Sequence, residues 1–340
     1  MMTKKNNSKA TKSLSEILLV EDVRKSYGPR PALRGLSFSL KAGHVMGFLG
    51  PNGAGKTTAI RILTTILEPD SGYFFVDGIS SEYPEMIRQK IGVLPESLGF
   101  PKQMTGYEFL VNFGELYGRT QNEAKACAME LLEEVGLQQR GKSLIGTYSR
   151  GMRQRLGIAR ALINDPVVVF LDEPTLGLDP HGQQELLTLV RRVSEERNAG
   201  VVLCSHLLPE IEGICDDVVI LNSGQVVAAG SVAEVIGRVQ RNIILHNSFR
   251  IQTTPQFVAE VRRTVKGLPE ILEATSQGEG DGWLRIELMD MSDGNLSHRS
   301  QINNRVLRAL ISAKIPIINF ETEGGRLQDV FLRLTEETIE

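Results

Sequence analysis

A glycine-rich segment from Gly50 to Thr58 carries the clearest chemical signal in the 340-residue sequence. It follows a short apolar run at 45–49, precedes a helical pattern at 57–67 and fits the spacing G-x-x-x-x-G-K-[ST]. Gly53 and Gly55 let the backbone turn tightly enough to point several N–H groups at phosphate oxygens. The start of the following helix adds a field that favours anions. The pattern predicts a phosphate-binding loop made of Gly50, Pro51, Asn52, Gly53, Ala54, Gly55, Lys56, Thr57 and Thr58.

Two side chains of this loop have more specific predicted roles. The Lys56 ammonium can lie against the β- and γ-phosphates of a nucleotide, and the Thr57 hydroxyl can bind Mg²⁺. The alternative is a plain glycine turn between a strand and a helix. The strand–loop–helix context favours the phosphate loop, as do the motifs that follow it.

Two carboxylates follow a second apolar run. Val167 to Leu171 has the pattern of a buried strand and leads directly into Asp172 and Glu173. Carboxylates at the carboxyl end of such a strand lie where α/β sheets bind ligands. We therefore expect Asp172 to bind Mg²⁺ and Glu173 to act as the general base, a role typically worth about 10²–10⁴-fold in rate. Two solvated carboxylates at a strand end are the alternative, and the upstream loop disfavours it.

A further motif lies shortly before the acidic strand. Residues Tyr148 to Arg155 read Tyr-Ser-Arg-Gly-Met-Arg-Gln-Arg. This segment resembles the signature motif of ATP-binding cassettes, usually Leu-Ser-Gly-Gly-Gln, and keeps its serine and second glycine. The resemblance implies that the signature segment of one chain caps the γ-phosphate bound to a second chain. The predicted signature residues are Ser149, Arg150, Gly151 and Met152.

The resemblance to ATP-binding cassettes covers about residues 17–230. Tyr27 looks like the aromatic residue that stacks on adenine, Asp179 like the D-loop aspartate and His206 like the switch histidine. Ile91 to Glu96 stands where the family has its Q-loop. The resemblance implies ATP and Mg²⁺ as cofactors and ATP hydrolysis as the activity. It places Thr57, Glu96 and Asp172 at the metal, and Lys56, Glu173 and His206 in catalysis.

Three positions depart from the family pattern. Glu96 replaces the usual glutamine, Arg150 the first signature glycine and Met152 the final glutamine. Glu96 can still bind Mg²⁺ or its water but adds a charge beside Asp172. Arg150 can reach the phosphate or face solvent, and both readings stay open.

The departures resemble the branch of the family that serves drug, sodium and gliding-motility exporters. The run from Gly47 to Asn52 is similar to that branch, and so is a C-terminal segment such as Leu327 to Leu332. This resemblance implies a homodimer that powers export through a separate integral-membrane permease and docks on it through residues 101–144. It also implies a cytoplasmic protein, peripheral on the inner face of the cell membrane, with membrane contact through the permease only.

The hydrophobic patterns predict the elements that position these motifs. Nearly continuous apolar runs at 45–49, 167–171, 201–204 and 218–221 are typical of parallel strands covered on both faces. Alternating patterns at 17–23 and 36–40 indicate antiparallel strands near the N-terminus, and helical spacing dominates 101–144. The expected fold is an α/β P-loop NTPase core, which the resemblance makes RecA-like, with an antiparallel β subdomain and a helical subdomain at about 97–150.

A second domain is expected toward the C-terminus. Strand patterns at 249–253, 271–276, 283–288 and 315–320 alternate with helical patterns at 255–265 and 302–313 in the order βαββαβ, which is typical of a ferredoxin-like α+β domain. Residues 278–282 are predicted to form a turn and 290–300 a polar loop. The predicted organisation is a disordered tail at 1–15, an ATP-binding domain at 16–240 and an accessory domain at 247–340.

Composition limits the other classes of function. A net charge of −3 gives no pull toward nucleic acid, and no apolar run approaches the ~18 residues that span a bilayer. The three cysteines lie far apart without a CxxC pair, as is typical of reduced thiols. The alternatives are a cassette ATPase not tied to transport, such as those of DNA repair or translation, and an ATP-binding regulator that turns over poorly.

Overall fold

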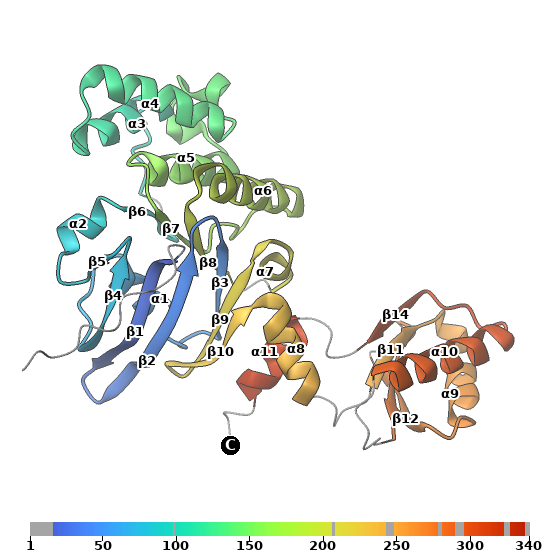
Figure 1. The fold of residues 1–340 in the computed structure, drawn as a ribbon. Helices are drawn as coiled ribbons and strands as arrows, with labels where there is room; N and C mark the ends of the chain where they lie inside the picture. Colours follow the sequence, from blue (N-terminus) through green and yellow to red (C-terminus); the bar gives the residue numbers. More distant parts are fainter. Residues whose placement is uncertain are drawn as a thin grey trace, which may run out of the picture. The chain divides into compact units, whose positions relative to one another are not determined.

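The computed structural model describes residues 16–97, 99–205, 208–242, 248–277, 281–289, 296–322 and 327–336. The chain divides into two compact units (Figure 1). The first extends to Val232 and includes the residues from Leu334 onward, and the second is Ala233–Arg333. Among the described helices, none combines the length and apolar character needed to cross a bilayer.

A six-stranded sheet forms the centre of the first unit. Its strand order is β10-β9-β3-β8-β7-β6, and only the β10–β9 pairing is antiparallel. All five residues of β3 and all five of β8 are buried, as the continuous apolar runs predicted. The strands are β3 (Val45–Leu49), β6 (Ile91–Leu94), β7 (Val168–Asp172), β8 (Gly200–Cys204), β9 (Asp217–Asn222) and β10 (Gln225–Ser231).

An antiparallel sheet of order β2-β1-β4-β5 completes the sheet structure of this unit. The sequence predicted parts of β1 (Glu16–Tyr27) and β2 (Arg30–Lys41) but missed β4 (Ser71–Val76) and β5 (Ile79–Ser80). Between the two sheets lies α1 (Lys56–Leu63), whose buried residues join one core cluster with strands of both sheets. This helix ends at Leu63, four residues before the predicted end at Leu67, because Thr65 adopts a left-handed conformation with φ of 61°.

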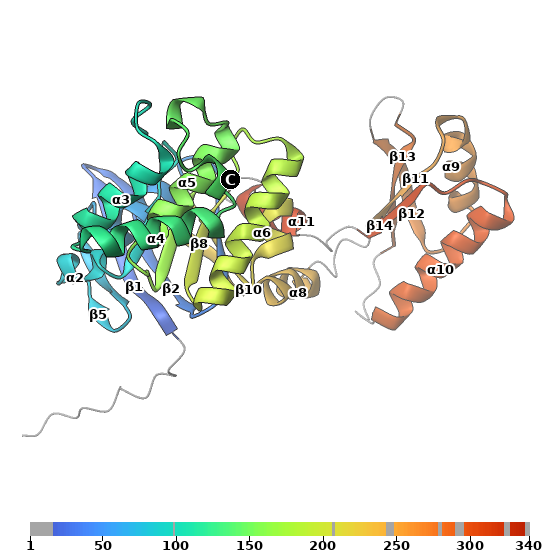
Figure 2. The ribbon, with the colours of Figure 1, turned by 90° about the horizontal axis from the view of Figure 1, so that it is seen from above.

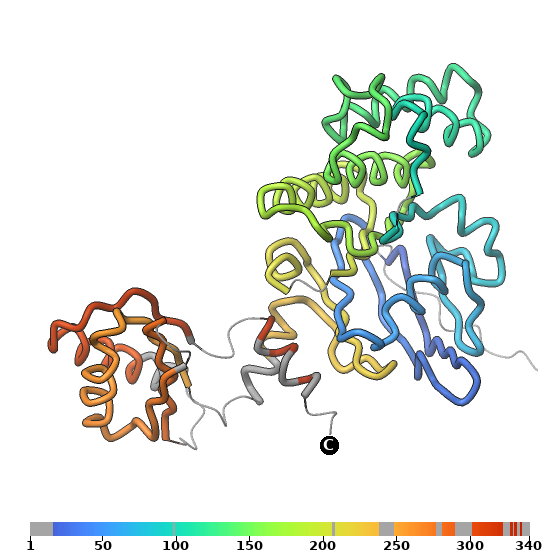
Figure 3. Tube along the Cα trace, turned by 180° about the vertical axis from the view of Figure 1, so that it is seen from behind, coloured from blue at the N-terminus to red at the C-terminus, as the bar shows by residue number. Residues whose placement is uncertain are grey.

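The predicted helical region is inserted in the sequence between β6 and β7, which pair directly in parallel. It forms a separate lobe beyond the sheet, coloured teal to green in Figure 3. It contains α3 (Gly106–Leu116) and α4 (Gln121–Glu134), which pack against each other, and leads into α5 (Arg150–Leu162) (Figure 2). Thr105 and Thr120 each form a capping box with the glutamate three residues later. The remaining helices of the unit are α2 (Pro84–Arg88), α6 (Pro180–Arg197) and α7 (Leu208–Ile214).

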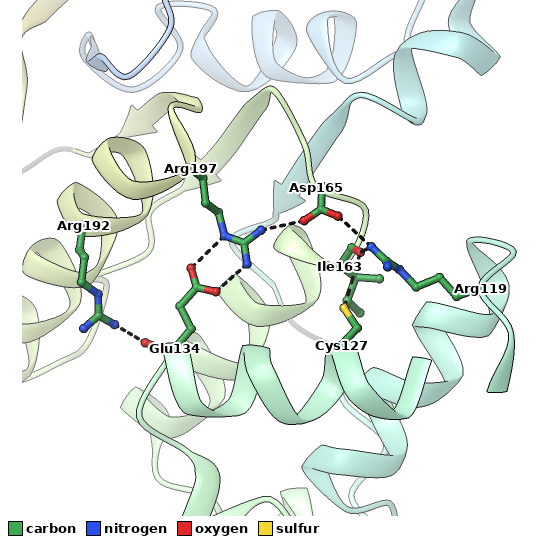
Figure 4. Close-up of polar contacts among 7 residues, drawn as sticks. All are labelled: Arg119, Cys127, Glu134, Ile163, Asp165, Arg192 and Arg197. Atoms are coloured by element: carbon green, nitrogen blue, oxygen red, sulfur yellow. Dashed lines mark hydrogen bonds and ion pairs between the residues drawn. The ribbon is translucent and has the colours of Figure 1, made fainter. Parts of the chain in front are cut away.

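A network of charged groups connects the helical region to α6 (Figure 4). The Arg197 guanidinium donates two hydrogen bonds to the Glu134 carboxylate, at 2.9 and 2.6 Å, and a third to Asp165 at 2.9 Å. Arg119 binds the other oxygen of Asp165 at 3.0 Å and the carbonyl of Ile163 at 2.7 Å. Because Glu134 ends α4 and Arg197 ends α6, this network holds the two helices together at their C-terminal ends.

The second unit has its own sheet and its own hydrophobic core. Its described elements follow the predicted βαββαβ order, and the antiparallel sheet has the order β12-β13-β11-β14. Side chains of this sheet pack with α9 and α10 around a core that includes Phe249, Val261, Leu284 and Val306. These elements are β11 (Ser248–Gln252), α9 (Val258–Lys266), β12 (Ile271–Gln277), β13 (Trp283–Leu288), α10 (Leu296–Ser312) and β14 (Asn319–Thr322). Two further helices, α8 (Val232–Asn242) and α11 (Leu327–Glu336), span the boundaries between the two units.

Two predictions for this unit were wrong in part. The polar segment 290–300 is helical from Leu296 onward. The prediction missed this start because Leu296 is the only apolar residue of α10 before Ile302, so the first turn shows no helical spacing of apolar residues. The last strand starts at Asn319 rather than Ile315, which is a buried core residue placed before the strand. Part of the predicted turn, residues 278–280, lies outside the described residues.

The charged network gives a prediction about stability. Arg197→Met should lower the free energy of unfolding by about 2 kcal/mol. Hydrogen bonds to charged groups contribute about 1.5–3 kcal/mol, and Glu134 would lose the guanidinium that binds both of its oxygens. Urea denaturation of both proteins measures this difference. As a control, Glu85→Gln removes the charge of an exposed pair with Arg88, leaves the hydrogen bond from Arg88 to Thr65 in place, and should change stability by less than about 0.5 kcal/mol. Equal effects of the two substitutions would contradict a special role for the network.

Candidate functional site

The phosphate-loop segment passes very close to the backbone of two strands. A Cβ atom at Gly50 would lie 2.5 Å from the carbonyl oxygen of Leu221 in β9, and one at Gly55 would lie 2.5 Å from that of Ala32 in β2. Gly53 and Gly55 have φ of 82° and 106°, a region that L side chains rarely adopt. These contacts explain why the loop needs glycine, and they fix its backbone between the two sheets.

Lys56 begins α1 and turns its side chain back over the loop. Its Nζ donates hydrogen bonds to the carbonyl oxygens of Gly50, at 2.6 Å, and Pro51, at 3.2 Å. An ammonium has three donors, so these two bonds leave one N–H for a phosphate oxygen. The lysine therefore both closes the loop on itself and places a positive charge beside it.

The N-terminus of α1 faces the same loop. Gly55 is its N-cap and has no side chain that could satisfy the first amide groups, and no acidic residue lies in the first turn. The first N–H groups of a helix lack partners within the helix and carry a partial positive charge. They are available to an anion held by the loop, and Thr57 is exposed in this first turn.

Carboxylates gather at the end of β7. Asp172 is the last residue of that strand and pairs with Cys204 of β8. Burial raises the pKa of Asp172, and the negative charges of Glu96 and Glu173 raise it further, while Lys56 lowers it. A bound cation would reduce the repulsion between these negative charges. Glu96 itself is exposed, yet its charge acts on Asp172.

These residues fit Mg²⁺ as part of a shared coordination sphere. The described residues contain no group of three or more His, Cys, Asp or Glu side chains arranged to hold a metal on its own. Mg²⁺ usually keeps several waters and takes only one or two carboxylates together with substrate phosphates. A hydroxyl from Thr57 and a carboxylate from Asp172 match that chemistry.

Glu173 follows Asp172 in an unusual backbone conformation. Its φ is 49°, and its backbone N–H donates to the carbonyl oxygen of Cys204 at 3.0 Å. A left-handed conformation at a residue other than glycine costs on the order of 1–3 kcal/mol and is concentrated at functional sites. The turn sets Glu173 at the carboxyl end of the sheet, one strand away from β3, which carries the phosphate loop.

The predicted signature segment forms the start of α5. Ser149 is the N-cap, and its Oγ accepts a hydrogen bond from the backbone N–H of Met152 at 3.2 Å. The Arg150 guanidinium lies over Gly177, where a Cβ atom would come within 2.5 Å of Nη1. Gly151 lies near Leu178, whose Cδ2 is 3.8 Å from its Cβ position. The signature turn therefore contacts the segment that leads into the predicted D-loop.

Two other predicted residues lie at defined places. The Asp179 side chain caps α6 by accepting a hydrogen bond from the backbone N–H of Gly182 at 2.9 Å. Tyr27 ends β1 and is 51% exposed, as an aromatic residue that stacks on a base must be. His206 lies outside the described residues, directly after Ser205.

Sequence reasoning missed one polar cluster behind these loops. Thr175 and Ser205 both donate to the carboxylate of Glu210 on α7, at 2.9 and 3.0 Å. No spacing rule connects a threonine, a serine and a glutamate that the sheet brings together. The only available signal was position, because Thr175 and Ser205 follow the two strand ends that carry the chemistry.

Comparison with known proteins agrees with this geometry. The family model described as ABC transporter matches residues 33–176. The linearmycin resistance ATP-binding protein LnrL of Bacillus subtilis is 32% identical over 325 residues, which cover 95% of this chain and 99% of LnrL. The bacitracin transport ATP-binding protein BcrA of Bacillus licheniformis is 41% identical over 62% of this chain and 69% of its own.

A solved structure has a similar fold over about two thirds of this chain. An ATP-binding subunit of an ABC transporter aligns with a TM-score of 0.58 and 30% sequence identity, covering 66% of this chain and 93% of its own. The phosphate loop, the acidic strand end and the helical region between β6 and β7 thus occur together in a chain that aligns with LnrL along nearly its whole length. The chain belongs to the family of ABC transporter ATP-binding proteins.

Proposed function

We propose that this chain hydrolyses ATP with Mg²⁺ to drive export through a separate membrane permease. One observation carries the proposal. The phosphate loop with Lys56 and the carboxylates Asp172 and Glu173 follow the carboxyl ends of parallel strands in one sheet. A nucleotide on the loop would therefore have its terminal phosphates beside the carboxylates. This is the arrangement that phosphoryl transfer requires, because its catalysis depends on positioning and charge.

Each residue then has a defined task. The loop amides and Lys56 hold the phosphates, and Thr57 and Asp172 would hold Mg²⁺, with Glu96 near Asp172. When bound, Mg²⁺ supplies positive charge that offsets the negative charge growing on the phosphate oxygens. Glu173 accepts the proton of the attacking water. His206 is proposed, from the family resemblance alone, to hold the γ-phosphate and the water in line.

The hydrolysis site is proposed to be complete only in a homodimer. The exposed signature residues Ser149 and Arg150 would face the γ-phosphate bound to the second chain, with Gly151 allowing close approach. Asp179 stands next to this turn at the start of α6. Loss of the shared phosphate contact after hydrolysis would let the dimer open, which is a switch based on differential binding.

Export and its cargo are supported by the relatives. One relative is named for resistance to linearmycin, one for bacitracin transport and one for doxorubicin resistance. The proposed cargo class is therefore an antibiotic. The protein would work at the cytoplasmic face of the membrane, held there by its permease. A cassette ATPase or regulator unconnected with transport is the competing function.

Co-purification tests the transport role. The tagged protein, isolated from detergent-solubilised membranes, should bring down an integral-membrane permease at near-equal amount, recognisable by several apolar stretches of about 20 residues each. Active ATPase that recovers no membrane-embedded partner would instead support the competing function. A Lys56→Ala variant is a useful control, because docking should not need a functional phosphate loop.

The phosphate loop gives a prediction about nucleotide binding. Lys56→Ala removes the ammonium beside the β- and γ-phosphates and should weaken ATP binding at least about tenfold, because a charged hydrogen bond is worth about 1.5–3 kcal/mol. Titration with a fluorescent ATP analogue measures the affinity. Lys90→Ala removes an exposed partner of Asp77 and should leave the affinity unchanged. Unchanged affinity in the Lys56 variant would refute the loop assignment.

The proposed base gives a prediction about turnover. Glu173→Gln keeps the shape of the side chain but cannot accept a proton, so kcat should fall by about 10²–10⁴-fold while ATP binding persists. The bound ATP should hold the protein as a dimer, which size-exclusion chromatography with and without ATP detects. Glu195→Gln on the exposed side of α6 is the matched control. A Glu173 variant that retains most of its hydrolysis would remove this residue as the base.

A further inference from the structure

Two buried hydroxyl groups converge on a single carboxylate oxygen behind the proposed hydrolysis site. Thr175 Oγ1 donates to Glu210 Oε2 at 2.9 Å, and Ser205 Oγ donates to the same oxygen at 3.0 Å. Thr175 and Ser205 are each only 1% exposed. The Glu210 carboxylate therefore joins two segments that are thirty residues apart in the sequence.

Both segments carry proposed catalytic residues. Thr175 lies two positions after Glu173, and Ser205 directly precedes His206. The backbone N–H of Glu173 already bonds to the carbonyl of Cys204, so the two segments start side by side at the strand ends. Glu210 adds a side-chain connection beyond these backbone bonds, at Thr175, two residues after Glu173, and at Ser205, one residue after Cys204.

The helix that carries Glu210 is itself held against the sheet. Ile211 of α7 is fully buried, and its Cγ2 would lie 2.5 Å from a Cβ atom at Gly47 of β3. Cys215, just beyond the helix, is 3.3 Å from the same position. The glycine in β3 lets α7 approach closely, and Glu210 is thereby presented to both segments from a fixed support.

A role in stability alone does not explain the carboxylate. Glu210 Oε1 is buried without a hydrogen-bond partner in the described part of the chain, although its neighbour Oε2 accepts two. A buried carboxylate oxygen left without a donor is unfavourable, so this arrangement of Glu210 costs stability while it holds the two hydroxyl groups. A role in the chemistry of the site is one explanation for such a group.

We propose that Glu210 is a positioning residue for ATP hydrolysis, which fixes the loop after Glu173 relative to Ser205 at the end of β8. The inference rests on the proposed ATPase function and adds to it a residue that itself contacts neither nucleotide nor metal. The base and the switch residue must act on one water molecule and one phosphate, and small misplacements of reacting groups lower rates steeply.

Steady-state hydrolysis by the full chain, with its variants, tests this proposal. Glu210→Ala should lower kcat about tenfold or more, since a misplacement of about 1 Å can cost 10²-fold, and should leave the KM for ATP within about twofold. Glu210→Gln keeps an oxygen that accepts both hydroxyl hydrogens and should recover most of kcat. Thr175→Val should reproduce part of the loss, and Thr175→Ser should restore it. Glu85→Ala, at a side chain that is 85% exposed on α2, is the control.

The outcomes separate the inference from the proposed function. Wild-type kcat in Glu210→Ala would overturn the inference and leave the ATPase function standing. Loss of kcat together with a matching rise in KM and a lower urea midpoint, without rescue by glutamine, would show general destabilisation and would also overturn it. A wild-type protein that binds or hydrolyses no ATP would overturn the proposed function first.

Discussion

The parallel pairing of β3, β8 and β7 is the constraint on which the site depends. In this register Phe48 is opposite Cys204, and Cys204 is opposite Asp172. The phosphate loop, the segment at Ser205 and the acidic pair therefore leave the sheet at one level, although they are far apart in the sequence. No side-chain contact creates this arrangement, because the backbone ladder of buried, apolar strands already determines it.

The same register brings negative charges together at the carboxyl end of β7. Burial raises the pKa of Asp172, the negative charges of Glu96 and Glu173 raise it further, and the positive charges of Lys56 and Arg61 lower it. The protein keeps the positive groups it needs on the other side of the loop, in the ammonium and the first amides of α1. In the proposed function, Mg²⁺ and nucleotide together would complete this balance of charge, so each would favour binding of the other. The left-handed backbone at Glu173 is a further sign that the edge is shaped for ligands rather than for stability.

Sequence reasoning succeeded where burial leaves a simple pattern. The limits of β3 and β13 were predicted to the residue, because a fully buried strand and a strictly alternating one each leave a clear signature. The strands β4 and β5 were missed because three exposed residues open β4 and β5 has only two residues. In β14 a buried isoleucine outside the strand moved the predicted start.

The site shows the same division. The phosphate loop and the acidic pair follow motifs whose spacing is set by local geometry, so their residues could be named in advance. The Arg150 contact with Gly177 and the hydroxyl pair on Glu210 arise only when distant segments meet, and single residues of common type give no warning of this. The roles of the predicted site residues remain predictions for the experiments above.

The separate hydrophobic core of the second unit has a consequence for how this family diversifies. Among the described residues, thirteen buried side chains form that core, twelve from its own strands and helices and Ile315 from the connection before β14. Some relatives align over about two thirds of this chain and others over nearly all of it. The second unit can therefore change its core residues without altering the strands that place the phosphate loop and the acidic pair.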